Sequence, residues 1–125
     1  MVRTLRIVML SLALGACTHA TQKGGRDQNV ITEEEIDASG GSSAYDVIVK
    51  VRPNFLSDRG KTTINGAAPN KPSVFLDGVH FGEISALRSL SARQLGSIRI
   101  YRAWEAQQKF GNGFVGGVLE LKTRQ

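Results

Sequence analysis

The pattern of hydrophobic and polar positions predicts two short helices in the first half of the chain. Thr32 and Glu35 have the spacing of a capping box, in which each side chain accepts a hydrogen bond from the backbone N–H of the other residue. The glycines and serines of residues 39–42 break this first helix. Ser42 and Ser43 can then cap a second helix.

The second helix covers residues 44–51, where hydrophobic residues recur at intervals of three and four. A strand is the alternative for this segment, because Val47, Ile48, Val49 and Val51 are β-branched. We expect the helix, ended by Pro53, which cannot continue a helical hydrogen-bond pattern.

Alternating or continuous hydrophobic runs predict strands in the second half of the chain. Residues 73–76 form a short buried run that ends in a turn at Asp77 and Gly78, and residues 79–81 begin the return strand of a hairpin. Residues 97–101 and 115–121 alternate hydrophobic and polar positions, which is typical of strands. One more short strand is expected near residues 62–64, inside a loop region rich in glycine and proline.

Helical spacing returns between and after these strands. Ile84, Leu87 and Leu90 recur at intervals of three, and Leu95 is expected in a second short turn. Residues 103–110 contain good helix formers and are followed by Gly111, a typical helix stop.

The resulting order of helix, strand, helix, strand, helix, strand predicts a small sheet covered by helices, of α+β or α/β class. We expect residues 74–76, 98–101 and 118–121 to share one sheet. The core should combine the inward strand residues with hydrophobic residues of the helices: Phe75, Ile98, Ile100, Leu119, Val47, Ile48, Val51, Leu87 and Leu95.

The beginning of the chain has the layout of a secretory signal. Arg3 and Arg6 precede an apolar run, residues 7–14, that is too short to span a bilayer as a helix, and the only cysteine, Cys17, follows small residues. Residues 14–17 resemble the lipobox of bacterial lipoproteins. The resemblance implies diacylglycerol on the Cys17 thiol, cleavage before Cys17 and acylation of the new N-terminus. An ordinary signal peptide that contains a cysteine is the alternative.

Three segments follow from this layout: a signal peptide at residues 1–16, a polar tether at residues 17–29 and a domain at residues 30–125. A lipidated Cys17 leaves no thiol for a disulfide, a nucleophile or a metal site. Thr18 stands where an aspartate would signal retention in the inner membrane. The lipobox resemblance therefore implies the periplasmic face of the outer membrane.

Charge is distributed unevenly along the expected mature chain. Residues 18–43 carry two basic and five acidic side chains, for a net charge of −3, whereas residues 44–125 carry twelve basic and six acidic ones, for +6. Nucleic acid is not expected as a partner behind a lipid anchor, because no aromatic-rich basic run accompanies the charge. The basic charge of residues 44–125 has two interpretations: attraction to anionic lipid headgroups, or a basic surface that is simply solvated. We favour the solvated surface.

Three segments in order resemble the plug domain of TonB-dependent outer-membrane receptors. Residues 74–79 are similar to the family's apolar strand running into Asp-Gly-Val, residues 95–102 to its next helix end and strand, and residues 110–124 to its glycine-rich turn and closing strand. The resemblance covers residues 31–124 and implies an α+β fold with a small mixed sheet and covering helices. In that family, the plug fills the barrel of a transporter.

The chain also departs from that family. Arg99 stands where the family has an acidic residue inside the second strand, and Ala103 and Trp104 stand where it has Gly-Pro. The sequence ends at Gln125 without a barrel. We therefore expect the resemblance to indicate a plug-like fold but not a transport function. Residues 29–32 are similar to the receptors' energy-coupling box, but we expect an ordinary linker there.

Catalytic, metal-binding and cofactor-binding residues are not expected. His80 lies near Asp77, but no Gly-x-Ser-x-Gly elbow presents a nucleophile, and one imidazole does not make a zinc site. We expect His80 to be a hairpin residue and Asp77 to bond the turn amides. Gly111, Gly113 and Gly116 have the spacing of a dinucleotide fingerprint, but a helix precedes them and a strand follows, which is the reverse of the fingerprint's context.

We therefore expect a non-enzymatic protein-binding module at the cell envelope. Its partners would be the membrane, through the anchor, and an envelope protein such as a TonB-dependent transporter. Arg99, Arg102 and Lys109 are the expected partner-binding residues, because they lie where the chain departs from the family. A periplasmic carrier that serves an outer-membrane transporter with a small ligand is the alternative. Trp104 is either a core residue or an exposed contact, and we expect the core.

Overall fold

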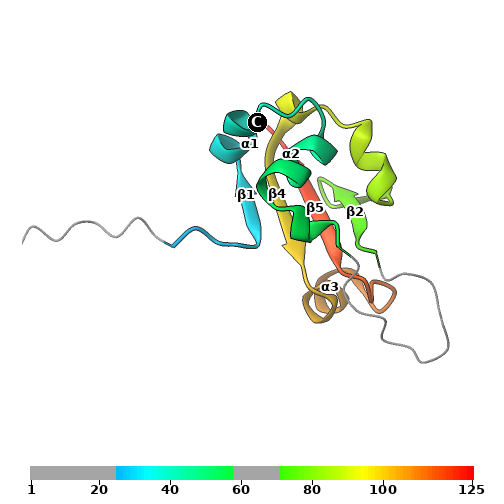
Figure 1. Ribbon diagram of the computed structural model, residues 1–125. Helices are drawn as coiled ribbons and strands as arrows, with labels where there is room; N and C mark the ends of the chain where they lie inside the picture. The colour runs from blue at the N-terminus through cyan, green and yellow to red at the C-terminus, as the bar shows by residue number, and fades with distance from the viewer. Residues whose placement is uncertain (1–24, 58–70) are drawn as a thin grey trace, which may run out of the picture.

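The computed structural model describes residues 25–57 and 71–125, which form a mixed five-stranded sheet with helices on both faces (Figure 1). The strands are β1 (Val30–Thr32), β2 (Ser73–Leu76), β3 (Val79–Gly82), β4 (Leu95–Tyr101) and β5 (Val118–Thr123). The helices are α1 (Glu33–Ser39), α2 (Ala44–Val51) and α3 (Ala103–Phe110), with 3-10 helices η1 (Pro53–Phe55), η2 (Ile84–Arg88) and η3 (Ala92–Gln94). The predicted α+β class with a small mixed sheet and covering helices is confirmed.

Strand β5 lies in the middle of the sheet, whose strand order is β1-β4-β5-β2-β3. It pairs antiparallel with β4 and parallel with β2, and the edge strands β1 and β3 pair antiparallel with their neighbours. The first four residues of β5 are all buried, as expected for a strand covered on both faces. The prediction that residues 74–76, 98–101 and 118–121 share one sheet is confirmed.

Both N-terminal helices begin with capping boxes. The Thr32 hydroxyl accepts a hydrogen bond from the Glu35 N–H at 3.4 Å, and the Glu35 carboxylate accepts one from the Thr32 N–H at 3.2 Å. Ser43 and Asp46 form the same arrangement at the start of α2. The Ser43 hydroxyl accepts a hydrogen bond from the Asp46 N–H at 3.2 Å, and the Asp46 carboxylate accepts one from the Ser43 N–H at 3.2 Å. Residues 44–51 form the predicted helix and not the alternative strand, because a helix brings the hydrophobic side chains of this segment onto one buried face.

The β2–β3 hairpin turns at Asp77 and Gly78, whose φ angles are 49° and 84°. Two successive positive φ angles define the type I′ turn, which an Asp-Gly pair favours. The prediction that Asp77 bonds the turn amides is wrong. Its carboxylate accepts hydrogen bonds from the Thr123 N–H at 3.0 Å and from the Thr123 hydroxyl at 2.9 Å. Asp77 thereby fastens the hairpin to the end of β5.

Strand β1 replaces part of the linker that was expected at residues 29–32. Ile31 pairs with Ile98 of β4 and is fully buried. A strand of three residues is too short to show an alternating pattern, so packing against the sheet decides its structure and the local sequence does not. The segment that is similar to the energy-coupling box is therefore built into the sheet.

Other boundaries also differ from the prediction. The helical spacing at residues 84–95 becomes the two 3-10 helices η2 and η3, and Leu95 begins β4 instead of completing a second turn. Strand β5 begins at Val118 and not at Val115, because the chain still turns at Gly117, where φ is +88° and an added Cβ would lie 2.6 Å from the Tyr101 carbonyl oxygen. The strand expected near residues 62–64 lies outside the described residues.

The main hydrophobic core lies between the sheet and helices α1 and α2. Phe75 is not part of it, because neighbouring residues of a strand point to opposite faces and Val74 occupies the core side of β2. Phe75 packs instead with Ala106 and Val118 on the other face. Val51 is only partly buried against the main core. The other predicted core residues are confirmed: Val47, Ile48, Leu87, Leu95, Ile98, Ile100 and Leu119.

Replacing Ile100 by alanine should lower the free energy of unfolding by roughly 2–5 kcal/mol, because the change removes buried methylene groups and leaves a cavity. Ile100 is 1% exposed, whereas Val79, also in a strand, is 70% exposed. Val79→Ala is therefore the matched control, with an expected change within about 0.5 kcal/mol. Urea unfolding followed by circular dichroism gives both values, and equal losses would contradict the placement of Ile100 in the core.

Candidate partner-binding face

Helix α3 covers one end of the outer face of the sheet, which is the face opposite α1 and α2 (Figure 1). Ala106 of α3 is fully buried there. The Phe110 ring centroid lies 4.4 Å from that of Phe75 and 5.5 Å from that of Tyr101. These contacts place a second, smaller hydrophobic cluster over the end of β4 and the beginning of β5.

The other end of the outer face carries polar and charged side chains. Ile98 and Ile100 point into the main core, so Arg99 between them points to the outer face. The Arg99 side chain is 47% exposed, and the strand register places the exposed Lys122 opposite Ser97. We call this region the open face; its residues are Val30, Ser97, Arg99 and Lys122.

Lys109, one of the predicted partner-binding residues, is held by an internal network. Its Nζ donates hydrogen bonds to Oε2 of Glu120 at 2.8 Å and to the Tyr101 hydroxyl oxygen at 2.7 Å. The Tyr101 hydroxyl donates to the same Glu120 oxygen at 2.8 Å. Because the Glu120 side chain is only 7% exposed, Lys109 neutralises a buried carboxylate. The structure gives Lys109 this role within the domain, while its side chain remains 44% exposed.

The same network shifts the pKa values of both charged groups. Burial by itself would lower the pKa of Lys109, but the hydrogen bonds to Glu120 and Tyr101 outweigh burial and raise that pKa. Burial would raise the pKa of Glu120, but the hydrogen bonds from Lys109 and Tyr101 outweigh it and lower that pKa. Lys109 and Glu120 are therefore both charged at neutral pH.

Arg99 and Arg102 lie in two different environments. The Arg99 guanidinium is 5.2 Å from the Tyr101 ring centroid and 4.0 Å from the Asp27 carboxylate, and it belongs to the open face. Arg102 is exposed just beyond the end of β4, where its backbone N–H donates to the Glu105 carboxylate at 2.9 Å. Lys109 lies against the same Tyr101 ring, with its Nζ 4.4 Å from the ring centroid, so the structure brings Arg99 and Lys109 together and leaves Arg102 apart from them.

The prediction that Trp104 is a core residue is wrong, because its side chain is 61% exposed. Helix α3 buries the side that carries Ala106 and Phe110, and a residue two positions before Ala106 lies on another side of the helix. His80 is an exposed residue of β3, as predicted for a hairpin, and its ring contacts Phe75 edge to face at 5.2 Å. Among the described residues, no three histidine, cysteine or acidic side chains gather as metal ligands.

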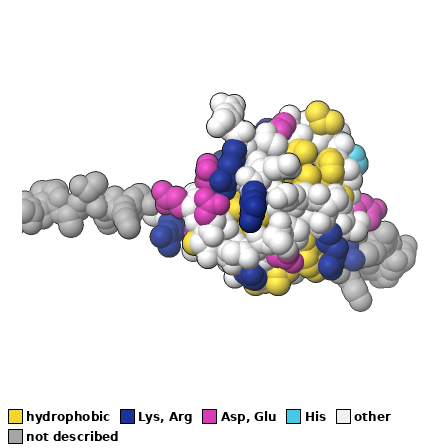
Figure 2. All heavy atoms as spheres, turned by 90° about the horizontal axis from the view of Figure 1, so that it is seen from above, with side chains coloured by type: hydrophobic (Ala, Val, Ile, Leu, Met, Phe, Trp, Pro, Cys, Tyr) yellow, Lys and Arg dark blue, Asp and Glu magenta, His cyan; other side chains and the backbone are white. Residues whose placement is uncertain are grey.

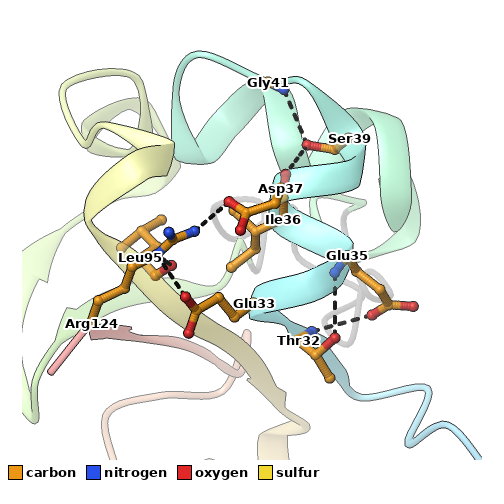
Figure 3. A network of polar contacts seen from close by, with 9 residues as sticks. All are labelled: Thr32, Glu33, Glu35, Ile36, Asp37, Ser39, Gly41, Leu95 and Arg124. Atoms are coloured by element: carbon orange, nitrogen blue, oxygen red, sulfur yellow. Dashed lines mark hydrogen bonds and ion pairs between the residues drawn. The ribbon is translucent and has the colours of Figure 1, made fainter.

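Arg124 makes a network that the sequence patterns did not reveal (Figure 3). Its guanidinium donates to the Leu95 carbonyl oxygen at 2.9 Å, lies 3.3 Å from the Glu33 carboxylate and bonds the Asp37 carboxylate. The hydrogen bond to Asp37 raises the pKa of Arg124. These contacts connect residues 87 positions apart and hold α1 against the end of the sheet.

A hollow of about 530 Å³ lies beside this network, between the α1–α2 connection and η3. Charged side chains at the hollow are Asp37, which already pairs with Arg124, and Arg93. The other lining residues are small or apolar: Ile36, Gly40, Gly41, Ser42, Ser91 and Ala92. The hollow is open and partly polar, so it is unlike an enclosed apolar ligand cavity.

Figure 2 shows one side of the surface, with acidic and basic side chains close together near the N-terminal segment and hydrophobic side chains gathered away from it. Large hydrophobic residues with substantial exposure are Val49, Val79, Phe81, Trp104 and Val115. No helix in residues 25–57 and 71–125 is long and apolar enough to cross a membrane.

Comparisons of this chain with protein-family models, with curated proteins and with solved structures give no match.

Replacing Lys109 by methionine should lower the free energy of unfolding at pH 7 by roughly 1–3 kcal/mol, because Glu120 loses a charged hydrogen-bond donor. The lowered pKa of Glu120 contributes stability above the pKa of the unfolded chain, and this stability is lost as pH falls through the folded-state pKa. The difference between the original protein and the variant should therefore shrink in acid. Urea unfolding between neutral and acidic pH measures it.

Lys122→Met is the control for this experiment. Lys122 is an exposed lysine on the same sheet face, and its charge is only the smallest of the causes that lower the pKa of Glu120. Its removal should therefore change stability by no more than about 0.5 kcal/mol, with a much weaker dependence on pH than that of Lys109→Met. A Lys109→Met cost that is equal to the Lys122→Met cost, or that does not change with pH, would show that the Glu120 pair does not stabilise the fold.

Proposed function

We propose that this protein is a bacterial lipoprotein, anchored through Cys17 to the periplasmic face of the outer membrane, and that its plug-like domain binds another envelope protein without catalysis. The resemblance to receptor plugs suggests a TonB-dependent transporter as the class of partner. Cys17 lies outside the described residues, so the anchor rests on the order of residues 3–17.

The observation that carries the binding proposal is the open face of the sheet. Arg99 and Lys122 extend from paired strands, so the backbone holds their positions relative to each other more firmly than a loop would. An exposed basic surface of this kind complements an acidic partner surface, and such complementarity increases the rate and selectivity of association. Arg99 is also where the chain carries the opposite charge from receptor plugs, which fits a partner other than the plug's own barrel.

The carrier alternative has less support from the described residues. A carrier needs a concave and mostly apolar site that buries most of its ligand. The hollow beside η3 is open, and the charge of Asp37 is already paired with Arg124. We therefore favour protein binding over transport of a small ligand.

Replacing Cys17 by serine should release the protein from the membrane fraction, because the thiol that accepts diacylglycerol is lost. Intact-mass measurement of the original protein should show the mass of residues 17–125 plus acyl chains. A protein that retains residues 1–16, or that carries a free thiol at Cys17, would overturn the lipoprotein proposal. Thr18→Ser is the control and should leave membrane attachment unchanged.

Arg99→Glu should reduce crosslinking of the protein to its partner in intact envelopes several-fold, because it introduces repulsion at the centre of the open face. The remaining binding should depend less on salt, since exposed charges are screened by ions. Quantitative mass spectrometry of crosslinked envelopes identifies the partner and measures both effects.

Arg93→Glu provides the matched control, because Arg93 is also exposed but lies on η3, before β4 begins. Equal crosslinking of both variants and of the original protein would exclude the open face as the binding surface. Hydrolysis of an ester, peptide or phosphate by the purified protein, abolished in His80→Ala, would instead overturn the non-catalytic part of the proposal.

A further inference from the structure

Two exposed hydrophobic residues lie at one end of the sheet. Trp104 follows the end of β4 by three residues, and Val115 precedes the beginning of β5 by three residues. Because β4 and β5 are antiparallel, both side chains are carried at the same end. They are 61% and 54% exposed, respectively. We call this region the Trp104 surface; its residues are Arg102, Trp104 and Val115.

The chain enters the domain at this same end. Strand β1 is antiparallel to β4, so the beginning of β1 lies beside the end of β4 (Figure 1). Val30 is opposite Arg99, and the Asn29 carbonyl oxygen accepts a hydrogen bond from the Ile100 N–H at 2.9 Å. The residues that lead back towards Cys17 therefore leave the domain close to the Trp104 surface.

The acidic groups at this end accept hydrogen bonds from the backbone, and the Asp27 side chain is 50% exposed. The Asp27 carboxylate accepts a hydrogen bond from the Asn29 N–H at 3.0 Å, and Glu105 accepts one from the Arg102 N–H at 2.9 Å. The Arg102 side chain is exposed, and no ion pair forms with it among the residues that the structure describes. Arg99 is paired with Asp27 at 4.0 Å, so the positive charge that this end presents beside its hydrophobic surface is carried by Arg102.

We propose that the Trp104 surface lies against an anionic phospholipid membrane. The inference rests on the proposed lipid anchor, which would hold this end of the domain near the bilayer. About a dozen residues separate Cys17 from Val30, and a fully extended chain of that length spans at most ~40 Å. Tryptophan rings are favoured at membrane–water interfaces, and an arginine beside the ring is attracted to anionic headgroups.

Trp104 is the only tryptophan in the chain, so its fluorescence reports on this surface directly. The purified mature protein is mixed with vesicles of phosphatidylethanolamine and phosphatidylglycerol, or of phosphatidylcholine alone. With the anionic vesicles, we expect a blue shift of the emission and protection from a water-soluble quencher. Arg102→Gln should lower the ratio of docked to undocked protein about fivefold, the effect of one basic residue near an anionic surface.

Arg93→Gln is the matched control, because Arg93 is exposed on η3 at the opposite end of β4 and should leave the ratio unchanged. Cosedimentation with the vesicles tests the anchor separately. Protein that cosediments without a blue shift would overturn the membrane-facing surface and leave the anchor intact. Protein that neither cosediments nor shifts would overturn both. An equal loss in Arg93→Gln and Arg102→Gln, or a shift that appears only when an envelope protein is added, would also overturn the membrane contact.

Discussion

Strand β5 joins the two halves of the sheet, because β1 and β4 lie on one side of it and β2 and β3 on the other. Its buried residues contribute to both hydrophobic clusters: Leu119 to the main core and Val118 to the cluster under α3. One of its buried side chains is a carboxylate, Glu120, and the Lys109 ammonium and the Tyr101 hydroxyl compensate its charge. Substitutions in β5 should therefore be poorly tolerated, because loss of its pairing would expose both hydrophobic clusters at once.

Features encoded within a few residues were predictable from the sequence, and features that depend on distant contacts were not. The capping residues Thr32 and Glu35 define the start of α1 locally, and the Asp-Gly pair at Asp77 defines its turn. Strand β1 has no local pattern of its own, and Trp104 has an exposed position that hydrophobicity alone does not indicate. The role of Lys109 depends on a carboxylate in another element, so no spacing within α3 could have revealed it.

The predicted partner-binding residues Arg99 and Arg102 lie on two surfaces that face different directions. Arg99 belongs to a face of the sheet, whereas Arg102 belongs to the end of its strands. If the end of the sheet that carries Trp104 contacts the membrane, the strands run away from the bilayer surface. The open face then points in a direction parallel to the membrane plane. A protein in the same membrane would then reach the open face by lateral diffusion. Membrane contact and protein binding would thus use separate residues and could occur together.

The position of β1 beside β4 has a mechanical consequence. The residues before Val30 do not continue the line of β1: the chain turns there, where the Val30 N–H donates to the Asp27 carbonyl oxygen at 3.0 Å, and it then runs away from the sheet at a wide angle to the strand (Figure 1). Tension that arrives through these residues therefore pulls across β1 and acts first on the turn and then on the residue pair of Val30 and Arg99. The three residue pairs between β1 and β4 would break one after another, and Ile31 would have to leave the core before the strand could separate. A pull on the tether is thus taken up by the first few residues of the domain before it reaches the rest of the sheet.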